Sequence, residues 1–380
     1  MLVTVSASKI LSRHLFQRHK ALRWAVPGGA LVVVAAVGSG MLASASANSD
    51  LPQMSAAQLL AAVEGAHLAG LSGTVVENAA LGLPQLPSFG PSSDGGSLIS
   101  MLSGSHTVRV WYAGPSEQRV ALVDTAGETD VFHDGTELWQ WDSDTQTATH
   151  TTLPASMRDS MTPSAVATIT PQAAATAALA AIGDSTTVTV QAQRLVADRD
   201  AYELVLTPTV STSRVGSVQI AVDGQTKVPL GVQVYARGDA STPALDVAFT
   251  KVDMSTPASS IFSFTPPKSA TVKQENFEDV PGAKQAGEVS SALTKVGSGW
   301  TTVLELRDGG LLGLPSTGGK ASGGSGGVES LVLSMLTPVS GTWGSGYLFD
   351  SKLLTGLVTG DGRVFVGAVD PQVLYAAAQK

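Results

Sequence analysis

The stretch that decides the fold class is AYELVLTP (residues 201–208), followed by VGSVQIAVDGQTKVPLGVQVYARGD (215–239) and ALDVAFTKVDMSTPASSIFSFTPPKSATV (244–272). Apolar side chains occupy every second position on both sides of Asp223-Gly224, namely Val218, Ile220, Val222, Val228, Leu230, Val232 and Val234. This period is typical of antiparallel strands that bury one face. Asp-Gly favours a short connection, so we expect a hairpin whose turn is a few residues long.

Similar alternation surrounds this hairpin and indicates that strands dominate the chain. Val108, Val110 and Tyr112 share one face of a strand that turns at Gly114-Pro115-Ser116 into a second strand with Val120 and Leu122. Further strands are predicted at 130–133, 137–141, 186–194, 202–208 and 244–252, which gives nine or ten in all.

Two helices interrupt the strand series. One is a short amphipathic helix near residues 55–68. The other is an Ala-rich helix at 171–182, with Thr170 placed to cap its first turn and Gly183 placed to end it. Residues 80–105 are rich in Pro, Gly and Ser but carry apolar side chains, so this loop is interpreted as a lid.

The order of these segments resembles the LolA/RseB superfamily over residues 51–272, and in particular its exported members of the actinobacterial kind. The likeness rests on the closing Phe262-Ser263-Phe264-Thr265-Pro266-Pro267 segment, on the bend at Val228-Pro229-Leu230, and on the Trp-bearing strand and polar return strand within 134–154. It implies an α+β, mainly antiparallel fold: a curved half-barrel sheet covered by helices. Relatives use the concave apolar face to hold acyl chains, or to regulate a membrane anti-sigma factor.

No cavity residue can be transferred individually from such a resemblance. The alternating apolar positions of the strands therefore serve as the predicted ligand-binding residues, although any single one of them taken alone is better explained as filling a core. They are Val110, Tyr112, Trp139, Trp141, Leu204, Leu206, Val232, Val234, Val247 and Phe249.

The N-terminus indicates the compartment. Five Lys and Arg residues precede an uncharged apolar stretch at 24–44, which is the charge order of a segment that exports the chain following it. The stretch is long enough for a membrane anchor, yet Ala45-Ser46-Ala47 also fits signal cleavage, so both readings stay open. We expect an exported protein, either anchored on the outer face of the cell membrane or secreted.

Composition excludes several functions. The chain has no cysteine, which removes disulfides, thiol catalysis and a lipid-modified Cys. The first 47 residues hold five of the 23 basic residues and no acid, so the remainder has 18 basic and 31 acidic residues and a net charge of −13. Such a body repels nucleic acid and anionic lipid head groups.

Four segments are expected: the leader or anchor at 1–47, the half-barrel domain at 48–273, a polar linker at 274–297, and a small C-terminal α+β domain at 298–380. In the last domain we predict a strand at 299–307 with Trp300, Leu304 and Leu306 on one face, a helix at 328–336, and strands at 342–349, 353–359 and 364–369. A final helix at 371–378 begins at Asp370. Residues 316–327 form a Gly/Ser loop.

Several short stretches match motifs for catalysis or metal binding, but the sequence around each of them does not suit that function. The G-x-S-x-G match at 323–327 lies in Gly/Ser repeats, the LPSTG match at 314–318 has a domain after it, and the phosphate-loop spacing at 313–320 is off by one residue. Asp142-Ser143-Asp144 is interpreted as a hairpin turn, and His133 as a solvated turn residue. His67, His106 and His150 are scattered. We expect no metal, no cofactor and no enzymatic activity.

Two functions remain. The first is a monomeric, non-catalytic protein that binds a lipid or a lipoprotein acyl chain in a half-barrel cavity. The alternative is a regulatory module that docks a membrane partner such as an anti-sigma factor. An enzyme of unknown type has no supporting motif.

Overall fold

The structure is a computed structural model that describes residues 51–81, 104–123, 127–159, 170–277, 292–307 and 336–379. The predicted leader, most of the predicted lid, the Gly/Ser loop and the helix expected at 328–336 lie outside these residues, as do the three motif matches between 313 and 327. Among the residues described, no helix is both long and apolar enough to cross a bilayer.

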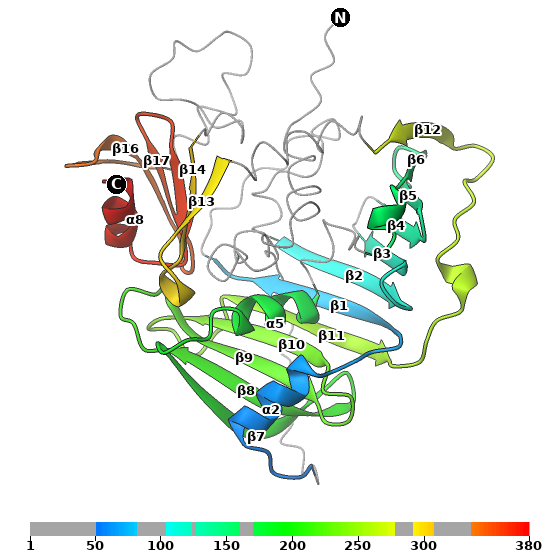
Figure 1. The fold of residues 1–380 in the computed structure, drawn as a ribbon, viewed down its shortest axis with the longest axis horizontal. Helices are drawn as coiled ribbons and strands as arrows, with labels where there is room; N and C mark the ends of the chain where they lie inside the picture. The colour runs from blue at the N-terminus through cyan, green and yellow to red at the C-terminus, as the bar shows by residue number, and fades with distance from the viewer. Residues whose placement is uncertain are drawn as a thin grey trace, which may run out of the picture.

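The larger of two sheets has twelve strands in the order β12-β6-β5-β4-β3-β2-β1-β11-β10-β9-β8-β7. Every neighbouring pair is antiparallel except β12 with β6. The strands are β1 (Leu71–Ala79), β2 (Gly104–Tyr112), β3 (Glu117–Val123), β4 (Glu128–Asp134), β5 (Glu137–Asp142), β6 (Thr147–Thr152), β7 (Thr186–Val196), β8 (Arg199–Pro208), β9 (Val215–Asp223), β10 (Pro229–Ala236), β11 (Leu245–Asp253) and β12 (Thr271–Asn276). The sheet curves without closing, so the mainly antiparallel α+β class is confirmed (Figure 1).

The hairpin β9–β10 forms where the alternation predicts it. Val218, Ile220 and Val222 are all buried, and their partners on β10 include Val234 and Val232. Asp223 organises the turn, because its carboxylate accepts hydrogen bonds from the backbone of Gln225 and Thr226 at 3.1 and 2.7 Å. The turn is a few residues long, as expected.

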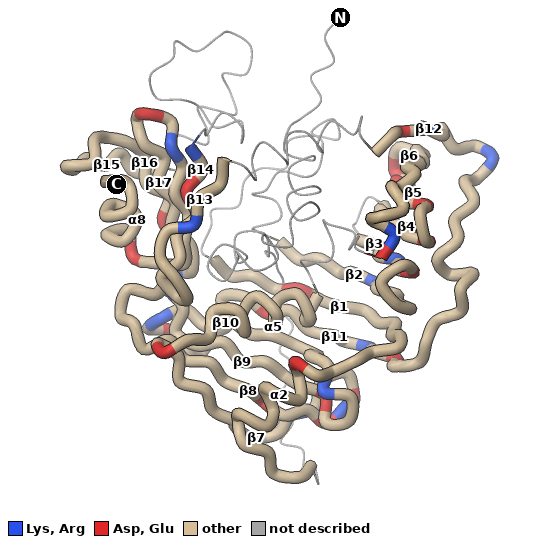
Figure 2. Tube along the Cα trace, viewed as in Figure 1, with Lys and Arg blue, Asp and Glu red and all other residues tan. Residues whose placement is uncertain are grey.

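Two helices pack on one face of the larger sheet. Helix α2 (Ala56–Glu64) starts with a capping box in which the Ser55 hydroxyl accepts from Gln58 N and the Gln58 side chain accepts from Ser55 N. Helix α5 (Pro171–Leu179) starts at a proline, and Thr170 Oγ1 accepts from Ala173 N, as predicted. Alanines on α5 let it lie close to β10 and β11, and it carries no charged residue (Figure 2).

The opposite face is crossed by the segment 254–270, which links β11 to the edge strand β12 (Figure 1). Phe264 of this segment stacks on Phe132 with ring centroids 4.6 Å apart and lies 5.5 and 6.0 Å from the rings of Trp139 and Trp141. The Phe-x-Phe segment is thus a strap (residues 254–270) fixed to the sheet by aromatic contacts.

The second sheet has six strands in the order β13-β14-β18-β17-β16-β15. Its elements are β13 (Leu293–Val296), β14 (Val303–Leu306), β15 (Thr337–Gly341), β16 (Gly344–Asp350), β17 (Thr355–Thr359), β18 (Val364–Gly367) and the final helix α8 (Pro371–Ala378). Strand β12 crosses the boundary expected at 273/274, and β13 lies inside the predicted linker.

The second sheet is joined to the first by side chains from several strands and their loops. Trp300 packs into the core of the larger sheet, and its indole N–H donates to Thr186 Oγ1 at 2.7 Å. It therefore does not share a face with Leu304 and Leu306, and that expectation is wrong: residues 299–301 form a 3₁₀ turn, so alternation begins only at Val303.

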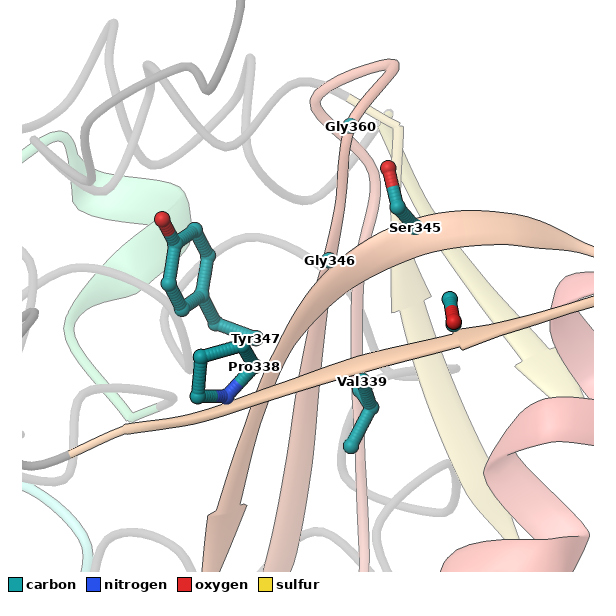
Figure 3. A pocket seen from close by; sticks show the side chains of 7 residues that line it. Pro338, Val339, Ser345, Gly346, Tyr347 and Gly360 are labelled. Carbon is teal, nitrogen blue, oxygen red and sulfur yellow. The ribbon is translucent and has the colours of Figure 1, made fainter.

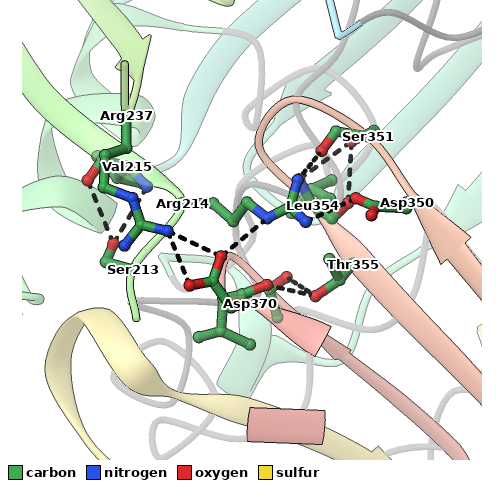
Figure 4. Close-up of polar contacts among 11 residues, drawn as sticks. Ser213, Arg214, Val215, Arg237, Asp350, Ser351, Leu354, Thr355 and Asp370 are labelled. Carbon is green, nitrogen blue, oxygen red and sulfur yellow. Dashed lines mark hydrogen bonds and ion pairs between the residues drawn. The ribbon is translucent and has the colours of Figure 1, made fainter. Parts of the chain in front are cut away.

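Asp370 is the polar centre of this joint (Figure 4). It occupies the N-cap position of α8, but its carboxylate makes no capping bond and instead accepts from Arg237 at 2.7 and 2.8 Å. Arg214 lies 3.4 Å from the same carboxylate and 2.8 Å from Asp350. Backbone bonds Arg214 N to Ala368 O and Asp370 N to Thr212 O complete the joint.

One further expectation is wrong. His133 is fully buried in β4 rather than solvated, and its Nε2 lies 2.8 Å from Gly135 O. Burial lowers the pKa of His133, so it is neutral at pH 7.

Removing the strap's aromatic contact should loosen the β4–β6 end of the sheet. We expect Phe264→Ala to lower the free energy of unfolding by about 1–2 kcal/mol, because it removes ring stacking and apolar burial. Urea unfolding followed by tryptophan fluorescence measures this free energy of unfolding. Thr265→Ala, an exposed neighbour on the strap, is the control; equal effects of the two variants would contradict the strap.

Neutralising Asp370 should loosen the joint locally. Asparagine still suits an N-cap, so Asp370→Asn leaves α8 intact and costs about 1 kcal/mol through the lost ion pairs. Hydrogen exchange followed by mass spectrometry should show faster exchange at the amides of Arg214 and Asp370. Asp361→Asn, which loses an ion pair inside the second sheet, should leave these amides unchanged; unchanged exchange in Asp370→Asn would refute the joint's dependence on charge.

Candidate functional site

The register of the strands decides which of the predicted ligand-binding residues lie on the same face of the sheet. Val110 faces Val120, Val120 faces Val131, and Val131 faces Gln140, so Gln140 shares the face of Val110 while its neighbours in sequence point away. Eight of the ten predicted ligand residues lie on the face that carries α2 and α5: Val110, Tyr112, Leu204, Leu206, Val232, Val234, Val247 and Phe249. Trp139 and Trp141 lie on the opposite face, beneath the strap.

The eight residues divide into two groups. Those on β8, β10 and β11 are at most 2% exposed and belong to the core formed with α2 and α5. Their members are Leu204, Leu206, Val232, Val234, Val247 and Phe249. In this half of the sheet the protein's own side chains fill the space over the strands.

The same face continues past the described helices onto β2, β3 and β4 (Figure 1). Tyr112 and Leu122 are half-buried at the margin of the core, and Val131 is half-buried further along. Val110 and Val120 lie between them, each 6% exposed. We call the surface formed by Val110, Tyr112, Val120, Leu122 and Val131 the open face. Leu122, Val120 and Val131 were missing from the predicted site because the sequence does not show where the helices end.

A carboxyl group lies at the junction of the core and the open face. Glu77 on β1 is two residues from Val75, faces Val247 on β11 and His106 on β2, and is 0% exposed. Neither of its carboxyl oxygens has a hydrogen-bond partner within the described chain, and the same holds for the buried Nε2 of His106. Burial raises the pKa of Glu77 to about 9, so the group is a neutral carboxylic acid at pH 7. Sequence analysis missed Glu77 entirely.

A second polar cluster lies on the opposite face, where its members pair with one another. Arg194 Nη1 donates to Gln233 at 3.0 Å, and Gln233 Nε2 donates to Asp246 at 3.1 Å. Glu203 lies 3.4 Å from Arg194. These contacts hold β7 against β10 and β11, which gives the cluster a structural role.

The second sheet carries a pocket of about 660 Å³ beside its edge strand β15 (Figure 3). Its walls are Pro338, Val339, Ser340, Ser345, Gly346, Tyr347 and Gly360. They offer one aromatic ring, small side chains and backbone, and no charged group, so the pocket has no evident catalytic chemistry.

Metal ligands do not converge within the described residues, where no group of three or more His, Asp or Glu side chains is placed to hold an ion. His150 Nε2 lies 2.5 Å from Glu137, and its ring stacks on Trp139 with centroids 4.3 Å apart. His106 and His133 are on other strands.

No family model and no curated protein sequence matches the chain. Several solved structures are similar to it. The MucA/MucB complex of Pseudomonas aeruginosa is similar over 85% of this chain and 96% of that chain, at 14% identity and a TM-score of 0.41. A LolA superfamily protein from Nitrosomonas europaea covers 56% of this chain and 99% of its own, at 12% identity and a TM-score of 0.21.

An uncharacterized conserved protein from Thermus thermophilus aligns over 58% of this chain and 99% of its own, at 11% identity and a TM-score of 0.31. The likeness is one of fold. It transfers no residue roles to this chain, and the actinobacterial kind of relative stays a prediction.

The buried Glu77 should make stability depend on pH. Its pKa is about 9 in the folded protein against 4.5 for the unfolded chain, so the folded state holds a proton that the unfolded state releases between these values. The contribution of Glu77 to stability is therefore fully present below about pH 4.5 and is lost as the pH rises toward 9. Relative to Glu77→Gln, the wild type should lose about 1.4 kcal/mol per pH unit across this window.

Urea unfolding at pH 5, 7 and 9 tests this. Glu64→Gln, at an exposed position on α2, is the matched control and should run parallel to the wild type. Parallel curves for Glu77→Gln and the wild type would show that Glu77 is ionised in the folded protein.

Proposed function

We propose that this protein is an exported, non-catalytic carrier or sensor of an apolar ligand, whose acyl chain lies along the open face. The observation that supports this most directly is the continuation of one apolar face beyond the described helices, with Tyr112, Leu122 and Val131 left half-buried. Contiguous apolar surfaces that the protein does not bury completely often bind a ligand.

The energy available is sufficient without covalent chemistry. Each methylene transferred from water onto such a surface contributes about 0.8 kcal/mol. Six sheltered methylenes would thus contribute about 5 kcal/mol before the cost of ordering the chain is subtracted. A lipid or the acyl group of a lipoprotein suits this surface better than a polar metabolite does.

Export supports the same function. The basic residues up to Arg23 and the apolar stretch at 24–44 suit a signal peptide or an anchor. A body with net charge −13 is repelled by anionic membrane surfaces, so we expect the ligand to be held by apolar contacts on the open face rather than by a basic patch.

A regulatory docking function is the second proposal. Among the described strands, β15 is the last of the second sheet, so one edge of its backbone has no described partner strand and could pair with an extended segment of another protein; the pocket lies beside it (Figure 3). The partner would be an envelope protein such as a membrane anti-sigma factor. A pull-down from membranes that recovers no such protein would contradict this second proposal.

Ligand binding is tested by placing an amide on the open face. We expect Leu122→Asn to weaken binding of a fluorescent acyl probe about tenfold, since about 1.4 kcal/mol of apolar contact is lost. Titration of the probe, with native mass spectrometry of lipid that copurifies, measures it. Val272→Asn, an exposed apolar position on β12, is the control and should bind as the wild type does. A wild type that binds no probe and carries no lipid would eliminate the carrier function.

A further inference from the structure

The described chain buries four carboxyl side chains almost completely, and only one of them lacks a partner. Asp130 lies 2.7 Å from Arg119, Asp223 lies 2.6 Å from Arg199, and Asp246 accepts from Gln233 at 3.1 Å. Glu77 is the fourth, and within the described residues neither of its oxygens is paired. A buried polar group without a partner destabilises a protein unless something else supplies the hydrogen bond.

The position of Glu77 shows where that partner would come from. Its side chain shares the helix-bearing face with Val75, and across the neighbouring strands it faces Val247 and His106. Val108, next to His106 on the same face, pairs with Leu122 of the open face. Leu122 on β3 is separated from Glu77 on β1 by strand β2 alone, so a ligand chain that runs from Leu122 across β2 would reach Glu77.

His106 completes a polar pair in otherwise aliphatic surroundings. Its Nε2 is buried and has no partner in the described chain, so two strands present hydrogen-bonding atoms to the same place. Helix α5, which packs on the adjoining β11, has no titratable side chain. The groups facing Glu77 from the described neighbours are therefore one imidazole and aliphatic side chains.

We propose that Glu77 and His106 recognise the uncharged, hydrogen-bonding linkage of an acyl lipid, an ester carbonyl above all, on the carrier's open face. This inference rests on the proposed carrier function and adds the class of ligand. The neutral carboxyl donates its O–H to the carbonyl oxygen, and the imidazole offers a second donor or acceptor.

Charged head groups fit this place poorly. Burial raises the pKa of Glu77, so pairing with an ammonium head would require this acid to release its proton to solvent, which burial opposes. A carboxylate or phosphate head would be desolvated among aliphatic side chains, with no Lys or Arg facing it from β1, β2 or β11 on this face. An ester needs only the hydrogen bonds that Glu77 and His106 lack.

Three probes with the same ten-carbon chain separate these cases: monodecanoylglycerol, decanoate and decyltrimethylammonium, titrated calorimetrically into the full chain at pH 7. We expect the wild type to prefer the ester. Glu77→Leu should weaken ester binding about tenfold and leave decanoate binding within about twofold, as expected for one lost hydrogen bond. Glu77→Gln keeps a donor and should retain the ester preference.

Glu203→Gln is the control, because Glu203 is a largely buried acid on the opposite face and should not affect any probe. His106→Phe is a second variant that keeps the surface apolar and should weaken the ester alone, about threefold. Both variants leave Glu77 in place, so His106→Phe still tests the proposal, with Glu203→Gln as its control, if Glu77→Leu does not fold.

The outcomes are distinct. Equal binding of all three probes by the wild type and by Glu77→Leu would overturn the role of Glu77 and leave the carrier function standing. A wild-type preference for decyltrimethylammonium would overturn it as well, in favour of an ionised Glu77. Failure of every probe to bind the wild type would refute the carrier function itself.

Discussion

The larger sheet depends on one long-range ladder, the pairing of β1 with β11. Strands β1–β6 form one antiparallel meander and β7–β11 form another, and β1 is the strand at which they meet. Val75 pairs with Phe249 and Ala79 with Leu245 across more than 160 residues of sequence. Gly73 makes the contact possible, because a Cβ there would come within 2.7 Å of the Phe249 ring. Without this ladder the helix-covered half and the open half would be separate sheets.

The two faces of the sheet that this ladder joins are covered by different parts of the chain. On one face α2 and α5 fill the space above β7–β11, and the apolar surface continues uncovered by described helices onto β2–β4. On the other face the strap takes the chain from β11 to the far edge, where β12 pairs in parallel with β6. Phe264 stacks on Phe132 and fixes the strap to this other face, opposite the face that carries the described helices.

Much of the fold could be predicted from sequence because alternation survives wherever one face is buried. The hairpins β2–β3 and β9–β10 and helix α5 formed where Val110, Val218 and Thr170 indicated them. Strand β1 could not be recognised, because Gly73 and Glu77 interrupt its apolar positions, and the need for each arises only from partners far along the chain. Alternation placed Trp139 with Trp141 on one face but did not say which face, since the register through β3 and β4 decides that.

The placement of an unpaired acid on the strand that joins the two halves is the feature that sequence patterns are least able to explain. At most central positions an apolar side chain would serve the ladder better, because an unsatisfied carboxyl gives up part of the free energy that burial contributes. The acids Asp130, Asp223 and Asp246 avoid this cost through arginine or amide partners. Glu77 stands at the boundary between filled core and open face, and under our proposal the bond that no described side chain supplies comes from the ligand. Among the described residues, burial of a carboxyl without a partner thus lowers stability where the filled core meets the open face, which is the place where we propose that an uncharged lipid binds.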